Sequence, residues 1–173
     1  MLRIPWLAVH LYIKFQRSPA LNSIELKIPP PAVAFLVCTA MWGLSLFTPV
    51  VDVSMFDRAM AALVLALIGG LFGAVAVVSF GRAKTTIHPT KPQATSSLVT
   101  TGIYRYTRNP MYVGVLLLIV AWAAFLCSPW ALLGPVAFVL YITRFQIQPE
   151  ERVLSGLFGA EYAAYRSRVR RWL

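Results

Sequence analysis

Acidic residues are scarce in this chain, which has six aspartates and glutamates against sixteen lysines and arginines in 173 residues. Cysteine and histidine are scarcer still, with two of each. Cys38 and Cys127 stand in apolar surroundings, where cysteine usually packs as a small hydrophobic side chain. His10 and His88 are far apart, and no spacing typical of a metal site or a catalytic triad occurs. The sequence therefore predicts no resident metal.

Apolar residues, by contrast, are abundant: 58% of the chain is hydrophobic, against about 45–50% in an ordinary soluble domain. Four runs approach or reach the length needed to cross a hydrocarbon core of roughly 30 Å as helices. They lie at residues 31–50, 59–80, 111–127 and 131–147. Because only residues 128–130 separate the last two runs, we expect them to form a helical hairpin. The predicted fold is an all-α, polytopic membrane protein with about four transmembrane helices.

The segments outside these runs complete the predicted organisation. Residues 4–15 (IPWLAVHLYIKF) are too short to span a bilayer and lack a small-residue cleavage site, so we expect an interfacial helix rather than a signal peptide. Three regions follow: an N-terminal interfacial segment at 1–30, two transmembrane helices at 31–80, and a core at 81–173 that contains a hairpin at 110–147 and C-terminal cytoplasmic helices.

The distribution of charge predicts the orientation in the membrane. Basic residues concentrate in residues 1–30, 81–110 and 148–173, whereas the connection 51–58 holds two acids and one base, and the turn 128–130 is uncharged. Lysine and arginine favour the cytoplasmic side of membrane proteins. Both termini are therefore expected in the cytoplasm, and the bilayer accounts for the net charge of +10 without nucleic acid as a partner.

Asn109 and Pro110 predict the start of the third apolar helix. Asparagine is a favoured cap, and proline is favoured at the first helical position. The free N–H groups of this helix end, together with Arg108, are suited to a small carboxylate or phosphate. The alternative is a plain helix end with Arg108 reaching the lipid headgroups.

The C-terminal tail opens with an acidic pair, Glu150 and Glu151, three residues beyond the apolar run. Acids complement the dipole at a helix start, but a carboxylate this close to the membrane also suits a cation such as an ammonium or a sulfonium. We expect Gly159 to end this first helix. Beyond it, aromatic and aliphatic residues recur every three or four positions from Tyr162 to Trp172 with arginines between them. This pattern predicts an amphipathic basic helix on the membrane surface.

Glycine suggests two further features of packing. Gly69 and Gly73 form a G-x-x-x-G step that favours close contact between helices, either within the chain or between chains. Gly134 and Pro135 are expected to kink the fourth apolar helix. Such a kink would open a lateral slot for a lipid tail.

Two quoted stretches carry a family resemblance: LVTTGIYRYTRNPMYVG at 98–114 and, after the predicted hairpin, EERVLSGLFGAEYAAYRSRVRRW at 150–172. In this order they resemble the isoprenylcysteine carboxyl methyltransferase family and, more loosely, the related phospholipid N-methyltransferases. The resemblance covers roughly residues 81–172. It implies transfer of a methyl group from S-adenosylmethionine to an acceptor within the membrane.

The resemblance and the charge pattern together give the candidate site. The expected cofactor-binding residues are Leu98, Val99, Tyr104, Arg108, Asn109, Pro110, Met111, Tyr112, Glu150 and Glu151. Arg108 and Glu150 would position the reactants, and no general base is assigned. In the resembling enzymes an arginine thought to meet the substrate carboxylate stands four residues before the glutamate. Here Gln146 takes that position and Arg144 stands two residues earlier, so these two are the candidate acceptor-binding residues.

Three functions remain open at this stage. The leading one is methylation of a carboxylate on a lipid-like or lipidated acceptor, because an ionised carboxylate needs no base. Methylation of a phospholipid amine is the second, with Glu151 or His88 as weak candidates for a base. The third is a non-enzymatic membrane protein that binds lipid or assists assembly.

Overall fold

The structure, a computed structural model, describes residues 25–82 and 97–173. Five α-helices lie in these ranges: α2 (Pro30–Ser45), α3 (Met55–Arg82), α4 (Pro110–Leu126), α5 (Leu133–Ile142) and α6 (Gln148–Arg168). The 3-10 turns η2 (Gly102–Arg105) and η3 (Pro129–Leu132) and the π-helical turn η4 (Thr143–Ile147) connect them. The described part of the chain is thus all-helical, as expected, and the predicted helix at 4–15 lies outside it.

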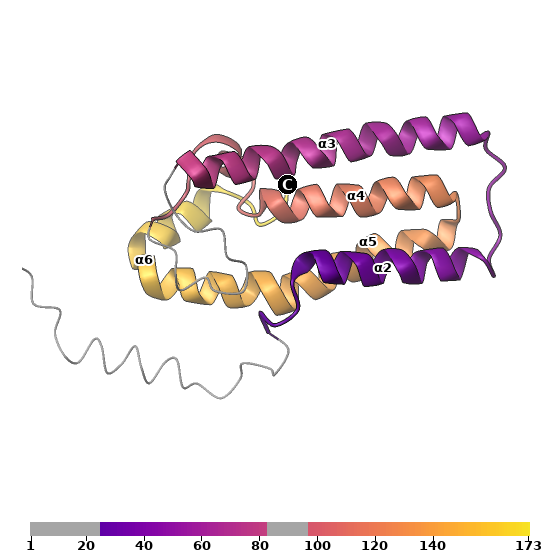
Figure 1. The fold of residues 1–173 in the computed structure, drawn as a ribbon. Helices are drawn as coiled ribbons and strands as arrows, with labels where there is room; N and C mark the ends of the chain where they lie inside the picture. The colour runs from indigo at the N-terminus through magenta and orange to yellow at the C-terminus, as the bar shows by residue number, and fades with distance from the viewer. Residues whose placement is uncertain (1–24, 83–96) are drawn as a thin grey trace, which may run out of the picture.

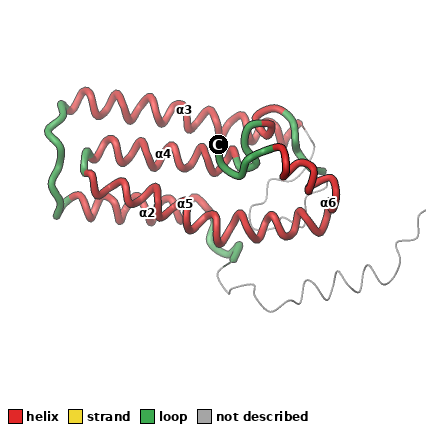
Figure 2. Tube along the Cα trace, turned by 180° about the vertical axis from the view of Figure 1, so that it is seen from behind, coloured by secondary structure: helices red, strands yellow, loops and turns green. Residues whose placement is uncertain are grey.

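The long helices lie side by side with their axes roughly aligned (Figure 1). α3 packs along α4, and α2 packs against both α4 and α5. The connections 46–54 and 127–132 lie at one end of this bundle, and α6 extends beyond the other end (Figure 1). Seen from behind, the C-terminus again lies beside the beginning of α4 (Figure 2). The chain therefore brings its last residues back to the end of the bundle where α4 starts.

Two helical stretches are long and apolar enough to cross a membrane, namely α3 and the continuous stretch Pro129–Arg168. The apolar part of the second ends at Ile147, beyond which the helix carries charged residues. The helices α2 and α4 are apolar but shorter, with 16 and 17 residues. The count of four spans and the transmembrane hairpin therefore remain predictions.

Glycine allows α3 and α4 to approach closely. A Cβ on Gly69 would stand 2.8 Å from the backbone oxygen of Gly114, and a Cβ on Gly114 would stand 2.7 Å from the backbone oxygen of Gly69 and 3.0 Å from the Gly73 nitrogen. The predicted glycine step thus makes its contact within the chain. Gly70, which is adjacent to Gly69, has open space beside it.

The prediction of a kink at Gly134 and Pro135 is wrong. Both residues lie in the first turn of α5, where proline removes no helical hydrogen bond because the N–H groups of a first turn have no partner within the helix. The irregularity lies later, in the π-helical turn Thr143–Ile147, after which the helix continues into α6. The expected end of the first tail helix at Gly159 is confirmed, since the φ of 47° and ψ of −118° at this residue separate two helical parts of α6.

Candidate functional site

Four segments meet at the end of the bundle where α4 begins: the stretch 97–109, the first turn of α4, the first half of α6 and the C-terminal residues after Arg168 (Figure 1). The first helical residue of α4 is Pro110 and its cap is Asn109, as predicted. The cap differs in detail, because the Asn109 side chain makes no capping bond. Its Nδ2 donates instead to the backbone oxygen of Arg171 at 2.8 Å.

Tyr112 and Glu150 form a close pair between α4 and α6. The Tyr112 hydroxyl donates to Glu150 Oε1 at 2.5 Å, and the Tyr112 side chain is buried. Among the described residues, no lysine or arginine forms an ion pair with Glu150. The pair therefore presents a carboxylate that has a hydrogen-bond donor but no compensating cation.

The surroundings disfavour charge on these groups. Glu150 lies three residues beyond the apolar run, outside the segment that we expect in hydrocarbon. Burial raises the pKa of its carboxyl to about 8, against the opposing effect of the Tyr112 hydrogen bond and with a smaller upward contribution from Glu151. Burial likewise raises the pKa of Tyr104 above its ordinary value, and Tyr165 and Glu150 raise it further. The three side chains of Tyr104, Tyr112 and Glu150 thus share one electrostatic environment.

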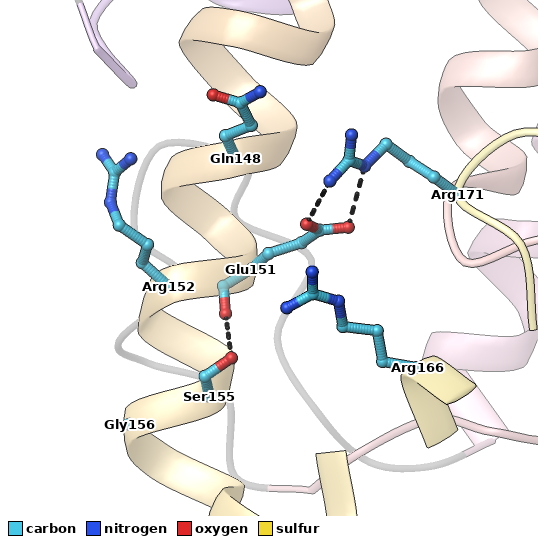
Figure 3. Close-up of a pocket in the computed structure, with 7 residues that line it drawn as sticks. All are labelled: Gln148, Glu151, Arg152, Ser155, Gly156, Arg166 and Arg171. Carbon is cyan, nitrogen blue, oxygen red and sulfur yellow. Dashed lines mark hydrogen bonds and ion pairs between the residues drawn. The ribbon is translucent and has the colours of Figure 1, made fainter. Parts of the chain in front are cut away.

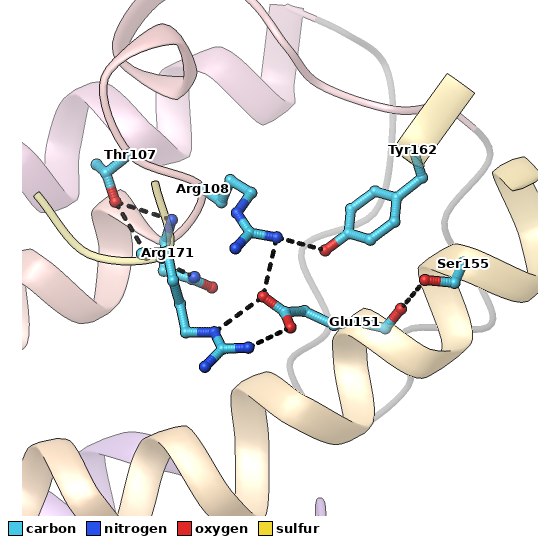
Figure 4. Close-up of polar contacts among 7 residues, drawn as sticks. Thr107, Arg108, Glu151, Ser155, Tyr162 and Arg171 are labelled. Carbon is cyan, nitrogen blue, oxygen red and sulfur yellow. Dashed lines mark hydrogen bonds and ion pairs between the residues drawn. The ribbon is translucent and has the colours of Figure 1, made fainter. Parts of the chain in front are cut away.

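Glu151, the second member of the acidic pair, is engaged by two arginines. Arg171 donates to both carboxylate oxygens, from Nε at 3.0 Å and from Nη2 at 2.7 Å (Figure 3). Arg108 Nη1 lies 3.0 Å from Glu151 Oε1 and 3.5 Å from the Tyr162 hydroxyl (Figure 4). Arg108 Nε, also buried, has no hydrogen-bond partner among the described residues. The two neighbouring glutamates therefore differ in their partners: Glu151 is paired with two arginines, whereas Glu150 has no ion-pair partner among the described residues.

The last residues of the chain act as a strap across the site, formed by residues 169–173. Thr107 and Arg170 form a parallel bridge, in which the Arg108 N–H donates to the Arg170 carbonyl at 2.9 Å. The Trp172 indole N–H donates to Thr143 Oγ1 at 3.2 Å. The strap thus ties the segment before α4 to the π-helical turn.

The two candidate acceptor-binding residues, Arg144 and Gln146, contact the segment just before α2. Arg144 Nη1 lies 2.5 Å from Glu25 Oε1, and Arg152 binds the other oxygen of the same carboxylate. Gln146 is buried and donates from Nε2 to the Ile28 carbonyl at 3.2 Å. Its Oε1 is buried without a partner among the described residues. Arg144 is therefore occupied by an ion pair, whereas Gln146 keeps one acceptor free.

Three of the remaining expected residues, Val99, Tyr104 and Met111, belong to one small apolar cluster. The fourth, Leu98, lies outside it. Val99 and Tyr104 are buried with Ala76 of α3, and Met111 packs against them. Tyr104 also contacts the ring of Phe80 edge to face, with ring centres 5.4 Å apart. Leu98 is half-buried beside Val99.

The prediction that the aromatic face of the last helix lies on the membrane surface is wrong. Tyr162 and Tyr165 are buried, and the Tyr165 hydroxyl donates to the Tyr104 carbonyl at 2.7 Å. Helix α6 ends at Arg168 and Val169 is extended. The three-residue spacing of Tyr162 and Tyr165 does place them on one face of a helix, but this face packs against the candidate site rather than against lipid. Sequence reasoning therefore missed Tyr162, Tyr165 and the strap.

No group of three or more histidine, cysteine, aspartate or glutamate side chains in the described ranges is arranged to hold a metal ion. The side chains gathered here suit an organic ligand with separate positive and negative groups. Glu150 offers a carboxylate for a cation, and Arg108 Nε offers a free donor for an anion.

Comparison with known proteins gives the family of the chain. The profile of the phospholipid methyltransferase family matches residues 57–161, more than half of the chain. A probable protein-S-isoprenylcysteine O-methyltransferase of Oryza sativa subsp. indica is 37% identical over 110 residues, which is 62% of this chain and 56% of that protein. The protein-S-isoprenylcysteine O-methyltransferase of Saccharomyces cerevisiae is 30% identical over 108 residues, 61% of this chain and 44% of that protein.

A third relative, an uncharacterized protein of Haemophilus influenzae, is 46% identical over 63 residues, all of that protein and 36% of this chain. The chain spans only about half the length of the named methyltransferases that it matches. The two long apolar helices and these relatives together support a membrane location. On the match to residues 57–161, the chain belongs to the phospholipid methyltransferase family, and several of its named relatives are protein-S-isoprenylcysteine O-methyltransferases.

Proposed function

We propose that this chain is a membrane methyltransferase that uses S-adenosylmethionine to methylate a lipid-like or lipidated acceptor, at a site facing the cytoplasm. The observation that carries the proposal is a pair of groups at the end of the bundle: the Glu150 carboxyl, which accepts a hydrogen bond from Tyr112 but has no basic partner, and the buried Arg108 Nε, which has no acceptor. Both statements apply to the described residues. A buried charge or donor without a partner is costly, so such groups favour a ligand that completes them.

The residues present fit the amino-acid end of this cofactor. Its ammonium group is suited to Glu150, which Tyr112 holds in place, and its carboxylate is suited to Arg108 Nε. The aromatic rings of Tyr104 and Tyr112 offer apolar surfaces for an adenine ring. When bound, the cofactor supplies a sulfonium methyl group that is already activated for transfer.

The protein's own contribution is then to bind, orient and exclude water. Glu150 and Tyr112 fix one end of the cofactor, and the buried cluster of Val99, Tyr104 and Met111 closes the side next to α3. Positioning of this kind lowers the barrier without an acid or a base when the acceptor is an ionised carboxylate. The names of the relatives favour such an acceptor, and isoprenylcysteine is the leading candidate.

A second acceptor class is favoured by Gln146. Its buried Oε1 lacks a donor within the described residues, and Arg144 is already paired with Glu25. Gln146 precedes Glu150 by four residues, so both side chains lie on similar faces of the helix. An acceptor with an N–H group, such as a phospholipid amine, would satisfy Gln146 Oε1, whereas a carboxylate would not.

The cofactor proposal is tested by calorimetric titration of the detergent-purified protein with S-adenosylhomocysteine. We expect Glu150→Gln to abolish binding, because the neutral amide no longer compensates the ligand's ammonium group. Glu161→Gln makes the same chemical change at an exposed position of α6 and should bind normally. Normal binding by the Glu150 variant would refute the assignment, and no binding by the folded parent protein in lipid nanodiscs would favour the non-enzymatic alternative.

The acceptor class is tested by incubating membranes with S-adenosylmethionine that is radiolabelled in its methyl group. A methyl ester releases its label as methanol in mild base, whereas an N-methyl group keeps it. Label that base releases supports a carboxylate acceptor. Label that base leaves in the lipid extract supports a phospholipid amine.

A further inference from the structure

A pocket of about 450 Å³, lined almost entirely by polar and charged residues, lies beside the first half of α6. Its lining contains three guanidinium groups, one carboxylate, an amide and a hydroxyl, on residues Gln148, Glu151, Arg152, Ser155, Gly156, Arg166 and Arg171. The five lining residues in the first half of α6, at positions 148–156, follow steps of one and three, so they share one face of the helix. Glu150 is not in this lining. The pocket therefore adjoins the proposed cofactor site at Glu151 but does not contain the Glu150 carboxylate.

Arginine reaches this pocket from the C-terminal part of the chain. Arg166 and Arg171 project toward the side of α6 that carries Glu151, while Arg152 projects away from them (Figure 3). Glu151 is the single acid in the lining, and it is already bound by Arg171 and by Arg108. The positive charge around Glu151 thus exceeds the negative charge.

Arg166 is the cation without compensation. Among the described residues its side chain forms no hydrogen bond and no ion pair. A guanidinium group presents N–H donors in a planar fork that matches the oxygens of a phosphate. The Arg166 side chain is free and the Arg171 side chain is 30% exposed, so the pocket offers guanidinium donors to a phosphate group, whereas the Ser155 hydroxyl already donates to the Glu151 carbonyl.

The position of the pocket relative to the apolar run indicates the source of that phosphate. Its first lining residue, Gln148, directly follows the apolar run that ends at Ile147, and the helix is continuous there. With that run in hydrocarbon, the pocket stands at the level of the lipid headgroups. Basic pockets at this level of the cytoplasmic side bind the headgroups of anionic lipids.

We propose that the pocket between Arg166, Arg171 and Ser155 binds a phosphate group, which the headgroup of an anionic membrane lipid supplies. Such a lipid would link the C-terminal part of α6 to the membrane. The inference does not depend on the proposed methyl transfer, because it concerns another ligand, although the pocket meets the proposed cofactor site at Glu151.

The test uses the full chain in detergent and two probes, monomeric dihexanoyl phosphatidylglycerol and inorganic phosphate, with binding measured by calorimetry. We expect Arg166→Gln to weaken binding of the preferred probe by about tenfold or more, and Arg166→Lys to restore part of it. Arg168→Gln is the matched control: it removes the same charge from the same helix, outside the lining. Arg166 has no structural partner, so its substitution should leave the fold intact.

The outcomes separate the sources of phosphate from a diffuse charge effect. If phosphatidylglycerol binds more tightly than inorganic phosphate, and Arg166→Gln weakens this binding while Arg168→Gln does not, the ligand is a lipid headgroup. Equal binding of both probes with the same sensitivity supports a phosphate site whose ligand is soluble. Equal weakening by both substitutions, or no binding of either probe, overturns the proposal.

Discussion

Two adjacent glutamates show how neighbouring residues acquire different roles. Glu151 is bound by Arg108 and Arg171, so its charge is neutralised within the protein. Glu150 receives one hydrogen bond from Tyr112 and no cation from the described residues. Since adjacent helical residues point about 100° apart, one member of the pair supports the structure while the other remains available to a ligand. The roles of the two carboxylates therefore follow from their partners.

The Tyr112 hydroxyl is expected to prepare Glu150 for the cofactor. In Tyr112→Phe the carboxylate loses its donor, and a hydrogen bond to a charged group contributes about 1.5–3 kcal/mol. We predict that S-adenosylhomocysteine binds this variant about ten- to a hundredfold more weakly at neutral pH. Tyr106→Phe, at an exposed tyrosine close by, is the control and should bind like the parent. Equal affinity of Tyr112→Phe and the parent would show that the hydroxyl has no part in binding.

Affinity is also expected to depend on pH through Glu150. With a pKa of about 8, the empty site holds this carboxyl mainly protonated at neutral pH. An ammonium ligand favours the ionised form and lowers that pKa, so binding releases a proton. We predict that affinity rises between pH 6 and pH 8, by at most about tenfold per pH unit, and then levels off.

Calorimetry in buffers with different ionisation enthalpies measures the released proton directly. A heat of binding that does not vary with the buffer at pH 7 would contradict this linkage. Glu161→Gln, which leaves Glu150 intact, should keep the pH dependence of the parent. The direction of the effect is fixed by the raised pKa, since a lowered pKa would leave affinity flat over this range.

At the scale of elements, glycine determines how closely α3 approaches α4. In Gly69→Ala the new methyl group would stand 2.8 Å from the Gly114 oxygen and 3.0 Å from Leu117 Cβ, so the two helices must separate. We predict a loss of about 1–3 kcal/mol in the free energy of unfolding. Gly70→Ala, one residue away, meets open space and should be neutral or slightly stabilising.

Reversible unfolding in mixed detergent micelles measures this difference in stability. The comparison is sharp because both variants add one methyl group to the same turn of α3. Equal stability of the two alanine variants would mean that α3 and α4 do not pack as closely as the Gly69 contact requires.

Sequence patterns predicted the elements well where local chemistry determines them. Asn109 and Pro110 marked the start of α4, and Gly159 marked the interruption of α6, because caps and glycine act within one turn. The kink at Pro135 was mislocated, since its cost depends on its position within the helix, which begins only at Leu133. The aromatic face of Tyr162 and Tyr165 was correctly periodic, but periodicity does not say which surface covers a helix face.

At the scale of the whole molecule, the site depends on contacts between distant parts of the chain. The position of Glu150 beyond the apolar run and a family resemblance predicted that it binds the cofactor. Its contact with Tyr112, which joins α6 to α4, is visible only in the structure. The partner of Arg108 was not predictable, because Glu151 is one of several acids that a nearby arginine can bind. The contacts of the strap were likewise invisible, since most of them use backbone groups that any residue provides.

The strap 169–173 joins the segment before α4 to α6 through backbone and side-chain contacts. It supplies the Arg170 carbonyl that receives the Arg108 N–H, the Arg171 carbonyl that receives the Asn109 amide and the Arg171 guanidinium that binds Glu151. Its removal leaves Glu151 with Arg108 alone and frees the segment before α4. We predict that a chain ending at Arg168 keeps its helix content but binds S-adenosylhomocysteine at least about tenfold more weakly, since several hydrogen bonds of about 1 kcal/mol are lost.

Circular dichroism and calorimetry together distinguish loss of the strap from loss of the fold. Removal of Leu173 alone is the matched control, because this residue is 64% exposed and makes none of the polar contacts of the strap. We expect the shorter truncation to bind like the full chain. If the chain ending at Arg168 is folded and binds with full affinity, then Arg108 and Asn109 hold their positions without the strap. In that case the order at the site comes from the helices α4 and α6 themselves.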